Sequence, residues 1–160
     1  MDLAMKQSHS MQSPGGLVGL GQNAVRLINT YAAPVLDLGL RVLVGMVFFK
    51  AGLTKIANWK STLFLFENEY QAPLLPPDIA AYMGTAAELA LPVFLVLGLG
   101  GRFAAAALFV FNIIAVISYP DLGEVGLKDH QYWGLLLLVT FMHGPGKLAL
   151  DHVISKKYSS

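Results

Sequence analysis

The sequence of 160 residues contains no cysteine. That absence excludes disulfides, thiolate metal sites and dithiol redox relays together. Charge is also scarce, because only 13% of the residues are Asp, Glu, Lys or Arg, against about 25% in ordinary soluble domains. The formal net charge is +1, and no basic run suggests a nucleic-acid partner. Any redox role would therefore need a bound cofactor, a quinone or a partner protein.

Apolar residues dominate what is present, at 55% of the chain. A helix needs about 20 mostly apolar residues to cross the hydrocarbon core of a bilayer. Four stretches approach this length, namely residues 35–57, 78–97, 102–119 and 131–150. The sequence therefore predicts an all-α fold, a four-helix transmembrane bundle with interfacial helical segments.

The remaining segments divide the chain around this membrane domain. Residues 1–16 are polar and read as a disordered tail. Residues 17–33 are mildly amphipathic and too short to span, so we expect an interfacial segment that ends before Pro34. The membrane domain should occupy residues 34–152, with an interface-lying stretch and a short helix near residues 60–70. Residues 153–160 form a short basic tail.

The distribution of basic residues predicts the topology. With four spans, one side of the membrane receives most of the basic residues, which are Lys6, Arg26, Arg102, Lys147, Lys156 and Lys157. The other side holds Lys60 and Lys128, with Lys55 at the edge of a span. The positive-inside rule therefore places both termini of this multi-pass membrane protein in the cytoplasm.

The first span carries a polar face. At about 100° per residue, six of its residues fall within roughly 40° of one line along the helix. They are Asp37, Arg41, Gly45, Phe48, Gly52 and Lys55. We expect this face to point into the bundle, with Gly45 and Gly52 allowing another helix to approach closely.

Other polar groups in the spans are candidate partners for this face. Ionisable groups in hydrocarbon usually face the bundle and find a partner. Arg41 and Glu88 are the opposite-sign pair that we expect, with Asp37 four residues before Arg41 and Asn112 in the third span. These four residues, Asp37, Arg41, Glu88 and Asn112, either only lock the helices together or line a polar pocket for a ligand or proton pathway.

Further polar and aromatic residues mark the ends of the spans. We assign Lys55, Trp59, Tyr132, Trp133, His143 and Lys147 to the membrane interfaces. His143 has no His, Asp or Glu at i+3 or i+4, so no metal site is predicted there. No arrangement of residues indicates a catalytic nucleophile, a nucleotide loop or a haem site.

Three motifs together resemble the DoxX family of small four-span membrane proteins. They are RVLVGMVFFKAGLTKI from Arg41, ELALPVFLVLGLGGR from Glu88 and WGLLLLVTFMHGPGKLALD from Trp133. The resemblance covers about residues 35–152. The stretch EYQAPLLPP from Glu69 and the closing HGPGK also look like a branch found beside peptide-modifying, metal-stress gene clusters.

The resemblance implies a limited set of functions. Relatives include the small membrane subunit of a thiosulfate:quinone oxidoreductase and a membrane component tied to thiol and superoxide stress. The absence of cysteine departs from the thiol-using relatives. We expect an accessory subunit of a redox or stress-response assembly, without activity by itself, that binds a quinone or lipid. Membrane lipids and membrane proteins, or further copies of the chain, would be its partners.

Two alternatives remain open at this point. The first is a small transporter or export partner for a solute or modified peptide, which the buried charges and the proline inside the second span would suit. The second is a structural membrane scaffold whose charges only hold helices together.

Overall fold

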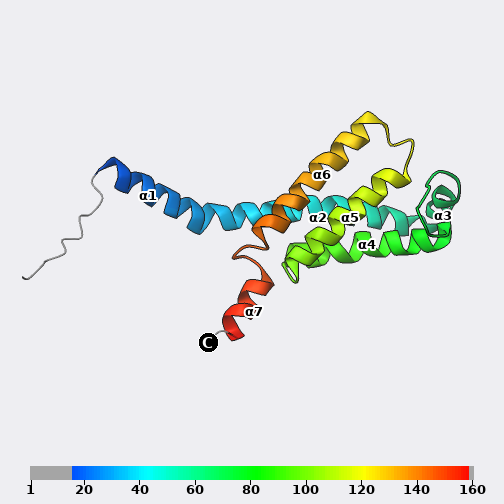
Figure 1. Cartoon of the computed structure of the whole chain (residues 1–160). Helices are drawn as coiled ribbons and strands as arrows, with labels where there is room; N and C mark the ends of the chain where they lie inside the picture. The colour runs from blue at the N-terminus through cyan, green and yellow to red at the C-terminus, as the bar shows by residue number, and fades with distance from the viewer. Residues whose placement is uncertain (1–15, 159–160) are drawn as a thin grey trace, which may run out of the picture. The chain divides into compact units, whose positions relative to one another are not determined.

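A computed structural model describes residues 16–158, so the predicted tail of residues 1–16 lies almost wholly outside the described part. The described residues form helices and contain no strand (Figure 1). In chain order the helices are α1 (Leu17–Leu27), the π-helix η1 (Ile28–Ala32), α2 (Ala33–Ala57), α3 (Trp59–Asn68), α4 (Pro77–Leu97), α5 (Gly101–Ser118), α6 (Gly123–His143) and α7 (Leu150–Tyr158). The predicted all-α membrane bundle is confirmed.

Three helical runs are long and apolar enough to cross a membrane, by length and composition. They are Val18–Ala57, Pro77–Leu97 and Gly101–Ser118. The fourth span was expected over residues 131–150 with a break at residues 143–146. Its start is wrong, because α6 begins at Gly123, whereas its end at His143 coincides with the expected break. Its first two turns carry Glu124, Lys128 and Asp129, so the apolar part of α6 is only its second half.

The helix expected to end before Pro34 does not end there. Pro34 has no N–H to donate, and its ring clashes with a regular helix at the carbonyl four residues earlier. The wider π-helix η1 lies directly before α2, with the N–H of Ala33 donating to the carbonyl of Ile28 five residues earlier, and helical structure passes through Pro34. By contacts the chain divides into two compact units, Met1–Ala33 and Pro34–Ser160.

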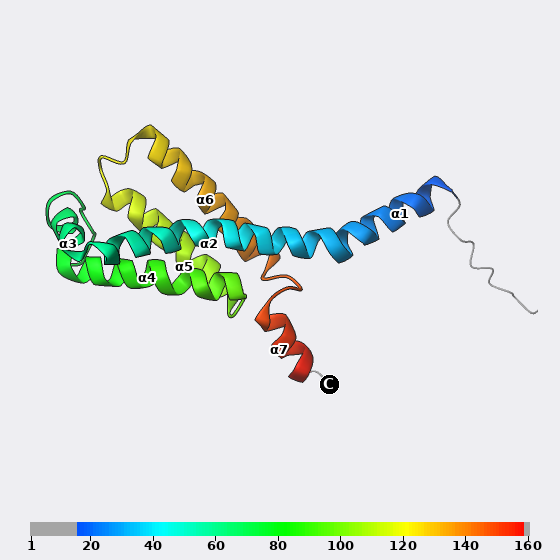
Figure 2. The same cartoon turned by 180° about the vertical axis from the view of Figure 1, so that it is seen from behind.

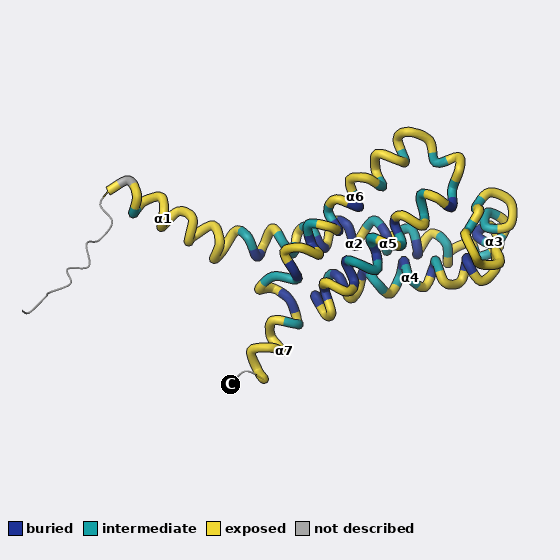
Figure 3. Tube along the Cα trace, in the orientation of Figure 1, coloured by how far each residue is buried: buried dark blue, intermediate teal, exposed yellow. Residues whose placement is uncertain are grey.

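Within the second unit, helices that are consecutive in the sequence from α3 to α6 pack against each other. α3 and α5 pack against α4, and α6 packs against α5 (Figures 1 and 2). The buried core cluster lies between α2, α4, α5 and α6. Its members are Val44, Phe48, Leu95, Ala104, Ala105, Leu108 and Leu137. Most buried residues lie on these inner faces, whereas α7 is almost entirely exposed (Figure 3).

Small residues set the closest approach between α2 and α4. A Cβ added at Gly45 would lie 2.9 Å from Cγ2 of Val96, and one added at Gly52 would lie 2.9 Å from the side chain of Leu89. α4 ends at Leu97 and is capped by Gly98, whose φ of 66° is left-handed and favours glycine. The turn to α5 is short, so these two helices run antiparallel.

Candidate functional site

The polar groups of the spans occupy three separate places in the second unit. Arg41 contacts the end of α4, Glu88 contacts Lys55, and Asn112 contacts α6. Along α2, Arg41 and Lys55 are 14 residues apart, or about 21 Å at 1.5 Å per residue. The structure therefore does not bring the four expected pocket residues together.

The first place is the Arg41 clamp, which we define as Arg41 and the carbonyls that it contacts. Arg41 is fully buried. Its Nη1 donates to the carbonyls of Leu95 and Val96 at 3.4 and 3.0 Å, and its Nη2 donates to that of Leu148 at 2.7 Å. Its Nε donates to the backbone carbonyl of Asp37 at 3.3 Å. The guanidinium therefore donates hydrogen bonds to carbonyl oxygens in the last turn of α4, where a helix has no further N–H groups of its own to pair with them.

Glycines allow close packing beside the clamp. A Cβ at Gly98 would lie 2.6 Å from Nη1 of Arg41, and one at Gly146 would lie 2.8 Å from Oδ2 of Asp37. Nearby, the carboxylate of Asp151 accepts hydrogen bonds from the backbone N–H groups of Gly100 and Gly101 at 2.9 and 3.0 Å. These contacts tie the start of α7 to the start of α5, so this end of the bundle is a structural joint.

The second place is an ion pair that the sequence did not predict. Nζ of Lys55 lies 2.6 Å from both carboxylate oxygens of Glu88. The expected pairing of Glu88 with Arg41 is therefore wrong. Lys55 lies on the same face of α2 as Arg41, nearly four turns further along the helix, and it is Lys55 that lies opposite Glu88. Lys55 had been assigned to the interface, but its side chain is only 20% exposed. The glycine at position 52 lets α4 come close enough for this pairing.

Other polar groups lie near this ion pair. Tyr70 stacks against Phe66 and Tyr119, with ring centroids 4.7 and 5.0 Å apart. Burial is the largest cause that raises the pKa of Tyr70. The electrostatic effects of Tyr119, Glu88 and Glu69 raise it further. Among the described residues, the buried hydroxyls of Thr85 and Ser118 have no hydrogen-bond partner.

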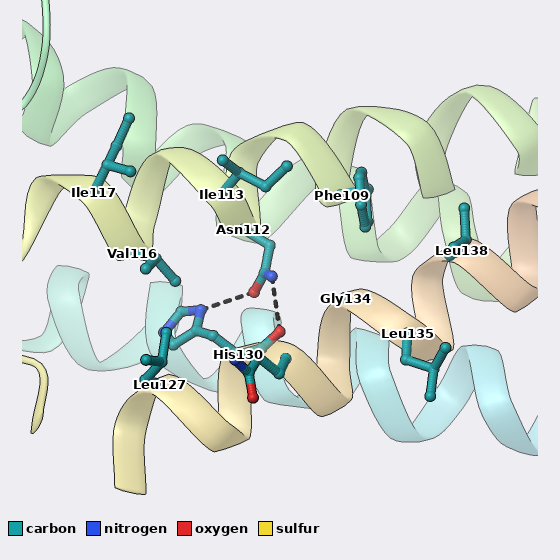
Figure 4. A pocket seen from close by; sticks show the side chains of 11 residues that line it. Phe109, Asn112, Ile113, Val116, Ile117, Leu127, His130, Gly134, Leu135 and Leu138 are labelled. Carbon is teal, nitrogen blue, oxygen red and sulfur yellow. Dashed lines mark hydrogen bonds between the residues drawn. The ribbon is translucent and has the colours of Figure 1, made fainter. Parts of the chain in front are cut away.

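The third place is the α5–α6 groove, an open hollow of about 400 Å³ between these two helices (Figure 4). Ligand pockets of small molecules start at about 300 Å³. The lining is mostly aliphatic and aromatic, and it consists of Phe109, Asn112, Ile113, Val116, Ile117, Leu127, His130, Gln131, Gly134, Leu135 and Leu138. Along α6 the lining extends from Leu127 to Leu138, or about 16 Å.

The polar wall of the groove is a pair of side chains, Asn112 and His130. Nδ2 of Asn112 donates to the backbone carbonyl of His130 at 2.9 Å, and Oδ1 lies 2.7 Å from Nδ1 of the imidazole. Asn112 is buried, and Gly134 admits its amide, since a Cβ there would lie 3.3 Å from Nδ2. Burial lowers the pKa of His130, with Asp129 opposing that shift. The groove thus combines a long apolar surface with one polar pair part-way along it.

Comparison with known sequences identifies the family. A model of the DoxX family matches residues 36–120, just over half of the chain. This chain belongs to the DoxX family. A Haemophilus influenzae protein described as uncharacterized is 31% identical to it over 128 residues, which cover 74% of this chain and 83% of the relative. No solved structure matches the sequence.

The interface residues assigned in this DoxX protein lie in different surroundings. Tyr132, His143 and Lys147 are exposed. Trp133 is half-buried and packs edge-on against Phe48 and His130, with ring centroids 6.0 and 4.7 Å apart. Trp59 packs against Tyr82 at 4.6 Å. In the described part of the chain, no cluster of three His, Asp or Glu side chains is arranged to hold a metal ion.

His130 is the groove residue that sequence reasoning missed. It lies beyond the part of the chain that the DoxX model matches, and it precedes the predicted fourth span by one residue. One signal was present in the sequence. In an antiparallel helix pair joined near Asp121, residues at equal distances from the turn lie opposite each other, and Asn112 and His130 are each nine residues from Asp121. That count predicts the pair.

Proposed function

We propose that this DoxX protein binds a quinone-like amphiphile in the α5–α6 groove and serves as an accessory subunit of a redox or stress-response assembly. The protein would lie in the bacterial inner membrane with both termini in the cytoplasm. The observation that carries the proposal is the union of the aliphatic groove with the Asn112–His130 pair. A quinone has the same two parts, a polar ring and a long apolar chain.

Depth supports this assignment. His130 follows the charged first turns of α6 and precedes its apolar half. A head group beside His130 would therefore lie near the level of the lipid head groups, while its chain would follow the groove toward Phe109 and Leu138 (Figure 4). At the Arg41 clamp and the Lys55–Glu88 pair, by contrast, the charges already contact protein groups.

Tryptophan fluorescence can test the proposal. The chain has two tryptophans, so Trp59→Phe leaves Trp133, which packs against His130, as the sole reporter. Quinones quench nearby indole rings. We expect saturable quenching when a short-chain quinone is added to this protein in lipid nanodiscs.

Two adjacent isoleucines provide a matched pair of variants. Ile113 and Ile114 are similarly exposed, at 46% and 39%, but only Ile113 lines the groove. Ile113→Phe should fill the groove and weaken binding about ten-fold, as expected for overpacking of a fitted site. Ile114→Phe should bind normally. Equal weakening in both variants would refute the groove as the site. Unchanged quenching in both would indicate only partition of the quinone into lipid and would favour the scaffold hypothesis.

A further inference from the structure

The orientation of the Asn112 amide can be assigned from its partners. The backbone carbonyl of His130 can only accept a hydrogen bond, so the Asn112 atom 2.9 Å from it must be the donating Nδ2. Oδ1 of the same amide then faces Nδ1 of the imidazole at 2.7 Å. An amide oxygen only accepts, so Nδ1 must carry a proton.

This assignment fixes the chemistry of the other ring nitrogen. In a neutral imidazole one nitrogen is a donor and the other an acceptor, so Nε2 of His130 is a bare acceptor. Within residues 16–158, Nε2 makes no hydrogen bond. In Figure 4 the side of the ring without a dashed line faces Val116 and Leu127, both of which line the groove.

The charges around the ring favour its neutral form. The α5 residues that line the groove carry no titratable side chain, and Asp129 is the charged group that acts on His130. Burial outweighs that carboxylate and lowers the pKa of the imidazole. At pH 7 and above, Nε2 is therefore available to accept a hydrogen bond from a ligand.

We infer that the α5–α6 groove selects head groups that donate a hydrogen bond, so that it binds a quinol more tightly than the corresponding quinone. The inference rests on the proposed function. A quinol hydroxyl can donate to Nε2, whereas a quinone carbonyl presents a second acceptor to it. Gln131, the other polar residue that lines the groove, carries both a donor and an acceptor and so discriminates against neither form.

The tautomer can be measured without any ligand. Long-range proton–nitrogen spectra of the protein labelled with 15N-histidine distinguish a protonated from a bare ring nitrogen. The signals of His130 are assigned by their absence in His130→Gln. At pH 8 we expect Nδ1 protonated and Nε2 bare. The opposite tautomer would overturn the inference, whatever the groove binds.

Binding in nanodiscs then tests the selection itself. Calorimetry under anaerobic conditions should show decylubiquinol binding about five-fold more tightly than decylubiquinone at pH 8, the effect of one hydrogen bond. The preference should shrink as the pH is lowered and Nε2 gains a proton. Equal affinities at pH 8 would overturn the inference and leave the proposed function standing. Absence of binding by both forms would overturn the two together.

Two further experiments test whether the hydroxyl comes from a quinol or a lipid, and what role Asn112 has. Phosphatidylglycerol has head-group hydroxyls and phosphatidylcholine has none, so displacement of quinol by the former alone would support donor selection and identify a lipid as occupant. Asn112→Asp places a carboxylate beside Nδ1 and favours the doubly protonated ring. The pKa of the imidazole therefore rises in this variant, and its preference for quinol should be lost at a higher pH than in the wild type. An unchanged pH dependence of that preference would contradict the inference.

Discussion

Two regions of the same bundle differ in how fully their polar side chains are hydrogen-bonded within the protein. At the Arg41 clamp a fully buried guanidinium donates to four main-chain carbonyls, and glycines allow close packing beside it. At the α5–α6 groove a histidine and an asparagine satisfy each other on one side, and the other side of the histidine ring borders an open hollow. Both regions hold polar side chains in an apolar surrounding, yet only one leaves hydrogen-bonding capacity for a ligand.

A buried charge is therefore, by itself, a weak indicator of a functional site. Such a charge must find partners, and in the clamp it finds them in the protein. A useful criterion is therefore what remains unpaired next to an accessible space. The groove meets that criterion with an uncharged residue pair, whereas the clamp, with the most conspicuous charge of the spans, does not.

Removal of the clamp should have the largest effect. Arg41→Met leaves the carbonyls of Val96 and Leu148 without the donor that Arg41 supplies, so we expect a loss of about 4 kcal/mol in the free energy of unfolding. Unfolding in mixed micelles can measure it. Arg26→Met makes the same chemical change at an exposed site and should cost little. A similar cost in both variants would contradict the structural role assigned to the clamp.

A substitution that crowds the clamp should have the second-largest effect on stability. Gly98 and Gly100 both have left-handed φ, at 66° and 58°, but a Cβ meets Ala149 at 2.5 Å at Gly98 and nothing within 4 Å at Gly100. Gly100→Ala should cost about 1 kcal/mol in unfolding free energy, from the backbone alone. Gly98→Ala should cost about 3 kcal/mol, because overpacking adds to that penalty. Equal losses would show that this end of the bundle is loosely packed.

The Lys55–Glu88 pair should have an intermediate effect. Glu88→Gln removes the charge that Lys55 meets, and we expect it to cost about 2 kcal/mol in unfolding free energy, less than a fully buried pair because Lys55 is partly exposed. Lys50→Met, an exposed lysine of the same helix, is the control. Adding Lys55→Met to Glu88→Gln should recover part of the loss. Strict additivity of the two changes would argue against direct pairing.

The groove should have the smallest effect on stability, and that effect should depend on pH. The pKa of His130 is lower in the folded protein than in the unfolded chain, so the unfolded chain binds more protons below about pH 6.5. Stability is therefore fully present above that pH and falls as the pH drops further. The midpoint of thermal unfolding, measured from pH 8 to pH 5, should fall less in His130→Gln. His143→Gln, at an exposed histidine, should follow the wild type.

Much of the fold was predictable because apolar length and proline placement determine where helices can span. The all-α bundle and the three apolar runs follow from this alone. The bounds of α6 did not, because its helix begins in charged residues that belong to no span, and neither did the passage through Pro34, which depends on the local π-helix. Residues 150–158, expected mainly as a tail, form α7.

The partners of the polar groups were harder to predict than their burial. Arg41 and Glu88 have opposite charge and similar predicted depth, but the pattern in sequence does not show that backbone carbonyls compete for the guanidinium. Two cations on one face of α2 were available to Glu88, and helix packing at Gly52 selects Lys55. The Asn112–His130 pair depends on the register of two helices across a turn, which only becomes definite once both helix ends are known.

The most direct test of the central claim is a crystal structure of the protein with a brominated quinol, in which anomalous scattering locates the bromine. We expect the anomalous peak in the α5–α6 groove, with the quinol hydroxyl within hydrogen-bonding distance of Nε2 of His130. A peak beside Arg41 or beside the Lys55–Glu88 pair, with the groove empty, would contradict the account.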